Sequence, residues 1–186
     1  ANNGELDFTD TDGIFDADGT FDASGGGVIT FTAAGTLRLK AETPILGSNA
    51  DFTEGTGTVV YDRPGDQTIF NITYYNLETN QSGLKKVAHT PLDVNGNLKI
   101  TNGTLDMTKG GTQNNVIDLE GNFTMVAGTF TAGTSDAHTV GGSWLENAGT
   151  FTAGTGKFTF EAIGGDKTIT TLSSFNDLSI ATSGNT

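Results

Sequence analysis

At 186 residues the chain is long enough to bury the core of one domain, and its acidic residues outnumber its basic residues by 22 to 9. The net charge of −13 makes nucleic acid and anionic membranes unfavourable partners, and the lack of cysteine excludes disulfides and thiolate metal sites. With 27 glycines and only 3 prolines, the composition favours short strands joined by tight turns. No apolar run approaches the roughly 20 residues that cross a bilayer, so we expect no membrane insertion.

The first element is an acidic run at residues 6–27, LDFTDTDGIFDADGTFDASGGG. Asp-Gly pairs recur in this run every 6 residues, and such pairs are turn signals. The spacing predicts very short strands that form the three sides of one coil, with Phe15 and Phe21 pointing inward. We therefore expect residues 1–27 to make an acidic N-terminal coil.

The same run holds the best candidate for a metal site. Calcium takes about six to eight oxygen ligands, and a D-x-D-G spacing places two carboxylates on one side of a tight turn. The candidate ligands are Asp10, Asp12, Asp16, Asp18 and Asp22. The run lacks the distal glutamate of an EF-hand loop, and separate corners of a coil would hold the pairs apart. Two interpretations therefore stay open: calcium as a cofactor, or turn-forming acids with no cofactor.

Strands are expected next at residues 29–32 and 36–40, where apolar and polar residues alternate. A turn at residues 63–66 precedes a strand region at 67–79. Residues 80–90 contain the only basic pair, Lys85 and Lys86, and are expected to form a longer corner.

One unit is copied along the chain and consists of a strand, a glycine corner and a second strand. It reads GTFDASGGGVITF at 19–31, ADFTEGTGTVVY at 50–61, GTFTAGTSDAHTV at 128–140 and GTFTAGTGKFTF at 149–160. Copies at 50 and 149 are 99 residues apart, and similar segments follow both, GDQTI at 65–69 and GDKTI at 165–169. This indicates a higher-order repeat of about 100 residues. The chain stops at 183–186, where the earlier copy continues, so we interpret it as a slice of a longer array.

A shorter repeat is clearest in three segments that align without gaps: VNGNLKITNGTLDM at 94–107, LEGNFTMVAGTFTA at 119–132 and VGGSWLENAGTFTA at 140–153. Alternating side chains point to opposite faces of a strand, so stacked copies should form apolar ladders inside. The alignment predicts one ladder of Leu98, Phe123 and Trp144, and a second of Leu105, Phe130 and Phe151.

One residue in this alignment conflicts with a buried ladder. Glu146 stands where the earlier copies have Ile100 and Met125, and an unpaired carboxylate is costly inside a protein. We therefore expect the third copy to slip, to bulge, or to place Glu146 at a widened corner.

These patterns predict an all-β fold, a parallel β-solenoid of about 7 to 8 coils with roughly 20 to 25 residues each. The solenoid would be a single elongated repeat domain over residues 1–186, with stacked coils at 28–186. A β-sandwich is the alternative, because short strands at regular spacing also fit that class. The solenoid is favoured because a sandwich does not require copies of one motif in register.

The repeat residues also resemble a known group of proteins. The pattern GTF-x-x-GTG, then G-x-x-TI, then NGNLxIxxGTL resembles the β-solenoid repeat segments of very large secreted and cell-surface, adhesin-like proteins of Bacteroidota. The resemblance covers about residues 19–184 and is weakest in the acidic run before Gly19. It implies an extracellular or cell-surface location and a stalk or adhesive role, with no catalytic residues to carry over.

A few histidine and aromatic side chains are further candidates for sites. His89 and His138 lie in no metal-ligand spacing and are expected to be solvated. Tyr74, Tyr75 and Trp144 would stack on sugars if they were exposed, but at least one aromatic residue of each local strand is expected in the core.

The functional expectation is a non-enzymatic structural module of a bacterial adhesin or extracellular filament, acting as a stiff spacer or a self-assembling fibre unit. Its partners would be neighbouring repeats or like subunits, together with surface glycans. The alternative is a carbohydrate-binding or carbohydrate-cleaving β-helix, although only two arginines are present to serve such a groove.

Overall fold

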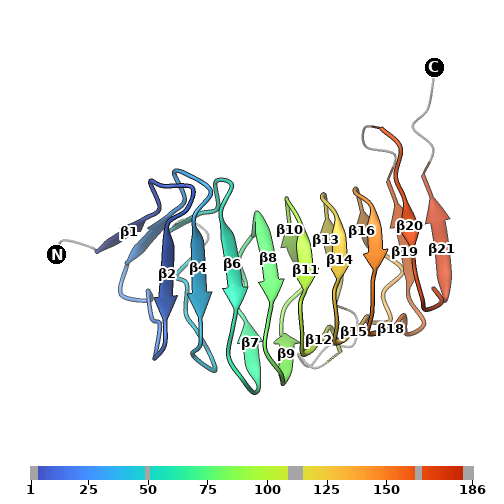
Figure 1. The fold of residues 1–186 in the computed structure, drawn as a ribbon, viewed down its shortest axis with the longest axis horizontal. Helices are drawn as coiled ribbons and strands as arrows, with labels where there is room; N and C mark the ends of the chain where they lie inside the picture. The colour runs from blue at the N-terminus through green and yellow to red at the C-terminus, as the bar shows by residue number, and fades with distance from the viewer. Residues whose placement is uncertain (1–3, 49–50, 109–114, 162–164, 182–186) are drawn as a thin grey trace.

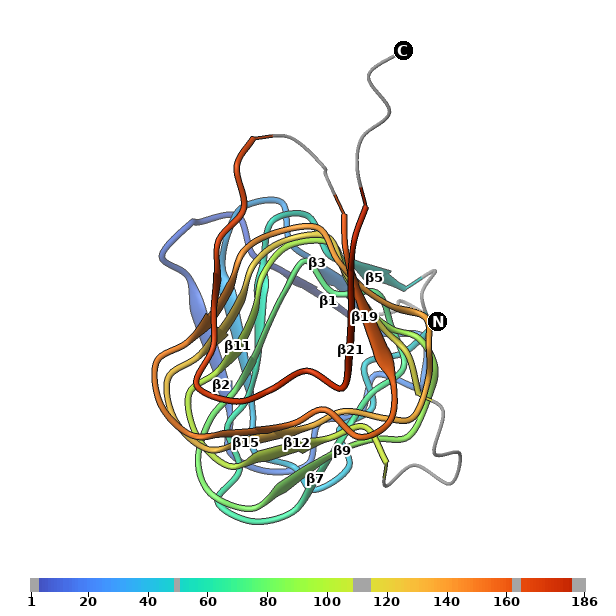
Figure 2. The same cartoon turned by 90° about the vertical axis from the view of Figure 1, so that its right-hand side faces the viewer.

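The computed structural model describes residues 4–48, 51–108, 115–161 and 165–181. Within them the chain winds as a parallel β-solenoid of about eight turns, with about 21 residues from one turn to the next (Figure 1). The end-on view shows three sides (Figure 2), and buried apolar side chains fill the space that they enclose. The predicted solenoid is thus confirmed and the β-sandwich is excluded. No described segment forms a helix that is long and apolar enough to cross a membrane.

Each side of the solenoid is built from parallel strands. Face 1 is one sheet of eight strands: β2 (Ile14–Ala17), β4 (Thr36–Leu39), β6 (Thr58–Tyr61), β8 (Asn76–Thr79), β11 (Leu98–Ile100), β14 (Phe123–Met125), β17 (Trp144–Glu146) and β20 (Ile169–Thr170). Face 2 is a sheet of five strands: β7 (Gln67–Ile69), β9 (Leu84–Val87), β12 (Thr104–Asp106), β15 (Thr129–Thr131) and β18 (Thr150–Thr152).

Face 3 consists of two sheets that follow one another along the axis. The first holds β1 (Glu5–Asp7), β3 (Val28–Thr30) and β5 (Phe52–Thr53). The second holds β10 (Leu92–Val94), β13 (Ile117–Leu119), β16 (His138–Val140), β19 (Lys157–Phe160) and β21 (Asp177–Ile180). A parallel bridge between Tyr74 and Val94 adds the intervening coil to this face.

The predicted apolar ladders are confirmed residue by residue. Phe123 pairs with Leu98 below it and Trp144 above it, and the same register joins the second ladder on face 2. The rings of Phe123 and Trp144 stack with centroids 3.8 Å apart, and both side chains are fully buried. Burying each such side chain contributes roughly 1.5–3 kcal/mol relative to leaving it exposed. One coil alone cannot bury its inward residues, so stacking in register is what stabilises the fold.

The copied unit is a side, a corner and the next side of a coil. At 149–160 it comprises β18, a corner and β19, and therefore runs from face 2 to face 3. At 50–61 it comprises β5, a corner and β6, and runs from face 3 to face 1. Segments that match in sequence 99 residues apart therefore lie on different faces. The origin of this match in a higher-order repeat stays a prediction.

The corner before face 1 is held by close backbone stacking and an asparagine ladder. A Cβ added at Gly121 would lie 2.0 Å from the carbonyl oxygen of Gly96, so only glycine fits there. Beside it, the Oδ1 of Asn97 accepts the backbone N–H of Asn122 at 3.0 Å and its side-chain amide at 3.1 Å. These bonds satisfy backbone groups that the corner removes from the sheets.

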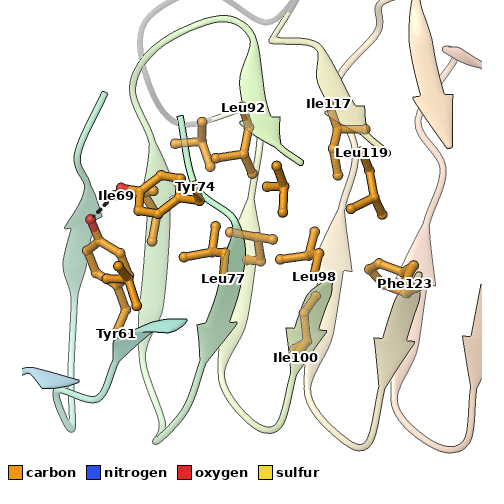
Figure 3. Close-up of a cluster of buried hydrophobic side chains, with 14 of the residues drawn as sticks. Tyr61, Ile69, Tyr74, Leu77, Leu92, Leu98, Ile100, Ile117, Leu119 and Phe123 are labelled. Carbon is orange, nitrogen blue, oxygen red and sulfur yellow. Dashed lines mark hydrogen bonds between the residues drawn. The ribbon is translucent and has the colours of Figure 1, made fainter. Parts of the chain in front are cut away.

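Two buried tyrosines, Tyr61 and Tyr74, lie close together in the core (Figure 3). They satisfy the backbone groups of Phe70, the residue that follows strand β7. The Tyr61 oxygen accepts the backbone N–H of Phe70 at 2.8 Å, and the Tyr74 hydroxyl donates to the Phe70 carbonyl at 2.6 Å. The two hydroxyl oxygens are 2.7 Å apart, so Tyr61 donates to Tyr74 and closes the network. Burial raises the pKa of both tyrosines, which therefore stay neutral donors.

One predicted element was wrong. Residues 80–90 were expected to form a longer corner, but they contain strand β9 on face 2. The local sequence LKKV hid this strand because Lys85 occupies the inward position between Gln67 and Leu105. The apolar alternation that marks a half-buried strand is lost when an inward residue is charged.

Candidate functional site

The five candidate aspartates lie at successive corners and sides of the first coil. Asp10 precedes β2, and its Oδ1 accepts the backbone N–H of Asp12 at 3.1 Å. Asp22 lies on the next side, and its Oδ1 accepts the N–H of Ser24 at 2.8 Å; hydrogen bonding from the side chain and the backbone of Ser24 lowers the pKa of that carboxyl. Both contacts are typical of aspartate in turns.

Asp16 and Asp18 converge on one cation from the second coil. The Lys40 ammonium lies 3.3 Å from Asp16 and also bonds Asp18, and these two carboxylates raise the pKa of Lys40. All three side chains are exposed or half-buried, so this ion pair adds little stability. Of the five candidate aspartates, the structure therefore brings Asp16 and Asp18 together, and both of them bond Lys40.

Within the described ranges, no three histidine or acidic side chains approach closely enough to hold a metal ion. The separation follows from the winding, because one turn of a three-sided coil carries Asp10, Asp16 and Asp22 to different places. Calcium binding by this run stays a prediction.

Comparisons with protein-family models, with curated proteins and with solved structures found no match.

The aromatic candidates for sugar binding mostly face the interior. Tyr74 and Trp144 are fully buried, which confirms the core alternative for these two residues and excludes their stacking on a sugar at the surface. Tyr75, the remaining candidate, is half-buried at the corner before β8. Trp144 instead packs against Phe123, Phe151 and other rings of the core.

Several buried polar side chains hold backbone groups of neighbouring coils. Lys85 is fully buried, and its ammonium donates to the carbonyls of Arg63 at 2.6 Å, Gly65 at 2.8 Å and Ser82 at 3.2 Å. Its three N–H groups are thereby satisfied, although burial lowers the pKa of Lys85 to about 8. Gln67, in the coil below, donates to the carbonyls of Leu39 and Ala41, both at 2.8 Å.

Glu146 is buried in the ladder without a slip or bulge, so that expectation was wrong. It pairs in register with Met125, and its carboxylate accepts four hydrogen bonds from the coil above. The donors are the hydroxyl of Thr171, the backbone N–H of Leu172, and the N–H and hydroxyl of Ser173, at 2.7 to 3.0 Å. Burial alone would raise the pKa of Glu146, but these hydrogen bonds outweigh it and lower the pKa.

His138 is also inside, contrary to the expectation that it is solvated. Its ring stacks on Phe158 with centroids 4.5 Å apart, and its Nδ1 accepts the backbone N–H of Ile117 at 3.2 Å. Burial lowers the pKa of His138, against smaller opposing effects of the Gly133 backbone and Asp136. The ring is therefore a neutral acceptor that replaces a ladder bond between β13 and β16.

This burial predicts a loss of stability in mild acid. Above an ordinary histidine pKa of about 6.5 both states are neutral, and below it the unfolded chain takes up a proton that folded His138 resists. The free energy of unfolding should then fall by up to about 1.4 kcal/mol per pH unit. Asparagine does not take up a proton in this pH range and keeps an acceptor near the Nδ1 position for the Ile117 N–H. His138→Asn should therefore remove the loss of stability between neutral pH and mild acid that His138 causes.

Urea titrations give the free energy of unfolding at pH 7.5 and at pH 5.5. The difference between these two values, compared between the wild type and His138→Asn, is the diagnostic quantity. His89→Asn separates the contribution of the other histidine, whose pKa is also lowered by burial. An unchanged pH difference in His138→Asn would show that this histidine does not contribute.

Proposed function

We propose that this chain is a non-enzymatic structural repeat module of a bacterial cell-surface adhesin or extracellular filament, in which it acts as a stiff spacer. The observation that carries the proposal is the single eight-stranded parallel sheet of face 1, which runs from the first coil to the eighth. Parallel strands lie about 4.8 Å apart, so the seven spacings between the eight strands of face 1 make about 34 Å of continuous hydrogen-bonded ladder. Bending such a rod would require breaking ladder bonds and core contacts together.

The polar side chains described above support the same role. Lys85, Gln67 and Glu146 each use their hydrogen bonds to hold backbone groups of an adjacent coil. The acidic net charge suits a secreted or surface protein, and because the chain has no cysteine its stability comes from packing and hydrogen bonds. Neighbouring repeats and surface glycans are the proposed partners.

Hydrogen exchange tests the stiffness of the spacer. Amides of β6, β8, β11 and β14, in the middle of face 1, should be protected to a similar degree, because they belong to one cooperative stack. If one central coil exchanged as fast as the corners, the rod would contain a hinge and the spacer proposal would fail. A glycan array and a polysaccharide lyase assay address the carbohydrate alternative, which the burial of Tyr74 and Trp144 weakens.

A further inference from the structure

Two asparagines of the described chain each stand directly before a glycine at a corner. Asn102 precedes Gly103 between β11 and β12, and Asn95 precedes Gly96 between β10 and β11. Asparagine is chemically labile in this setting, because the backbone nitrogen of the next residue can attack the side-chain Cγ and glycine has no side chain to shield that nitrogen. The local sequence does not distinguish the two pairs, but the structure does.

At Asn102 the reacting atoms lie together. The Gly103 N–H donates to Oδ1 of Asn102 at 2.8 Å, so the nitrogen lies beside Cγ, the atom to which Oδ1 is bonded. Among the described residues no other group accepts this N–H. Asn102 is also exposed, so hydroxide and water reach it. Holding a nucleophile next to its target in this way lowers the barrier to reaction.

At Asn95 the same atoms are held apart by other contacts. Gly96 is buried, and its N–H donates to the carbonyl of Tyr75 at 2.7 Å. The side-chain amide of Asn95 donates to the carboxylate of Glu54 at 2.6 Å. The Gly96 nitrogen would have to give up its hydrogen bond before it could attack. Losing one such bond is enough to slow a reaction about tenfold or more.

We propose that Asn102 is a site of spontaneous deamidation. Hydroxide removes the Gly103 N–H proton, the nitrogen forms a bond to Cγ of Asn102, and the Cγ–Nδ2 bond breaks as ammonia leaves with a proton from water. Water then opens the cyclic imide. Cleavage of the bond between the imide nitrogen and Cγ gives aspartate, and cleavage of the bond to the main-chain carbonyl gives isoaspartate, whose backbone passes through Cγ.

The isoaspartate product affects the stacking of coils. A Cβ added at Gly103 would lie 2.5 Å from the carbonyl oxygen of Gln81, and one at Gly128 would lie 2.3 Å from that of Gly103. Isoaspartate adds a methylene group to the main chain at this closely stacked corner, so it separates the coils locally, whereas aspartate adds only a charge. The register partners of Asn102 in other coils have no side-chain amide; they are Ser82, Ala127 and Ala148.

Peptide mapping by mass spectrometry tests the proposal, because it measures each asparagine separately. Deamidation adds about 1 Da to the peptide that contains it. In the folded full chain, kept in warm and mildly alkaline buffer, Asn102 should react about tenfold or more faster than Asn95 and give both products. In guanidinium chloride the contacts of Gly96 and Asn95 are lost, so the two sites should react at similar rates.

Asn102→Ala is the matched variant, since alanine stands at this corner position in two other coils. It should keep the fold and show no deamidation at this corner, while Asn95 reacts as slowly as in the wild type. Asn102→Asp represents the aspartate product, and the isolated isoaspartate form should unfold at a lower urea concentration than this variant.

The proposal is overturned if Asn102 stays intact in the folded chain, or if Asn95 reacts there as fast as Asn102. An isoaspartate form as stable as Asn102→Asp would overturn the predicted separation of the coils.

Discussion

Replacing Gly121 by alanine should lower the free energy of unfolding by at least about 3 kcal/mol, near the upper end for a single substitution. Its new Cβ would lie 2.0 Å from the carbonyl oxygen of Gly96 and 2.5 Å from the carbonyl carbon, and neither atom can move away as a flexible side chain could. The next coil is equally close, because a Cβ on Gly142 would lie 2.2 Å from the oxygen of Gly121. Relief would require separating coils on both sides.

Urea unfolding followed by circular dichroism measures this effect, and Gly25→Ala is the matched control. A Cβ at Gly25 meets nothing within 4 Å, so that variant should unfold within about 0.5 kcal/mol of the wild type. Equal stabilities for the two variants would mean that the corners do not stack as closely as described.

Glu146→Met should destabilise the chain by about 2–3 kcal/mol, although it completes the apolar ladder of Ile100 and Met125. The substitution removes the acceptor of the Leu172 and Ser173 backbone N–H groups, which form part-buried hydrogen bonds with Glu146, and leaving these donors unpaired is costly. Because hydrogen bonds lower the pKa of Glu146, its contribution is present above the ordinary pKa of about 4.5 and is lost as the pH falls below it.

Glu146→Gln is the control for this substitution. The amide keeps one oxygen for the two backbone donors, and its nitrogen can donate to the Ser173 hydroxyl, so we expect a loss of only about 1 kcal/mol. At pH 7 the free energy of unfolding should be highest for the wild type, lower for Glu146→Gln and lowest for Glu146→Met. A Met variant as stable as the wild type would show that apolar stacking outweighs the hydrogen bonds.

The sequence predicts the repeated part of this fold well, and the reason is physical. In a parallel solenoid each inward position contacts the same position of the next coil, so a gapless alignment is also a contact list. Leu98, Phe123 and Trp144 were placed correctly for that reason.

The polar interior could not be predicted in the same way. Lys85, His138 and Glu146 are buried because groups from other coils bond them, and those groups are backbone atoms or neutral side chains. Alternation within one strand reports only the polarity of a side chain, so each of the three was expected at a corner or in solvent. Ser173 and Thr171, which follow Glu146 at a spacing of about one coil, were the available signal for its partners.

The candidate site was predicted less well than the fold. Two close Asp-Gly pairs indicated turns, and in the same run Asp10 and Asp22 each accept a backbone N–H from two residues further on, a contact typical of aspartate next to turns. Asp16 and Asp18 both form ion pairs with Lys40, which lies in the next coil. The acidic run alone does not contain this lysine, so its local sequence could not predict the contact.

The most direct test of in-register stacking is a pair of engineered disulfides, because the chain has no cysteine of its own. Thr131 and Thr152 are register partners on face 2, and parallel neighbours have Cα atoms about 4.8 Å apart, within the range that a disulfide spans. Thr131→Cys with Thr152→Cys should therefore cross-link completely under mild oxidation and keep the fold. The pair Thr131→Cys with Thr150→Cys, offset by two residues, should stay reduced; preferential cross-linking of that offset pair would contradict the register on which the whole account rests.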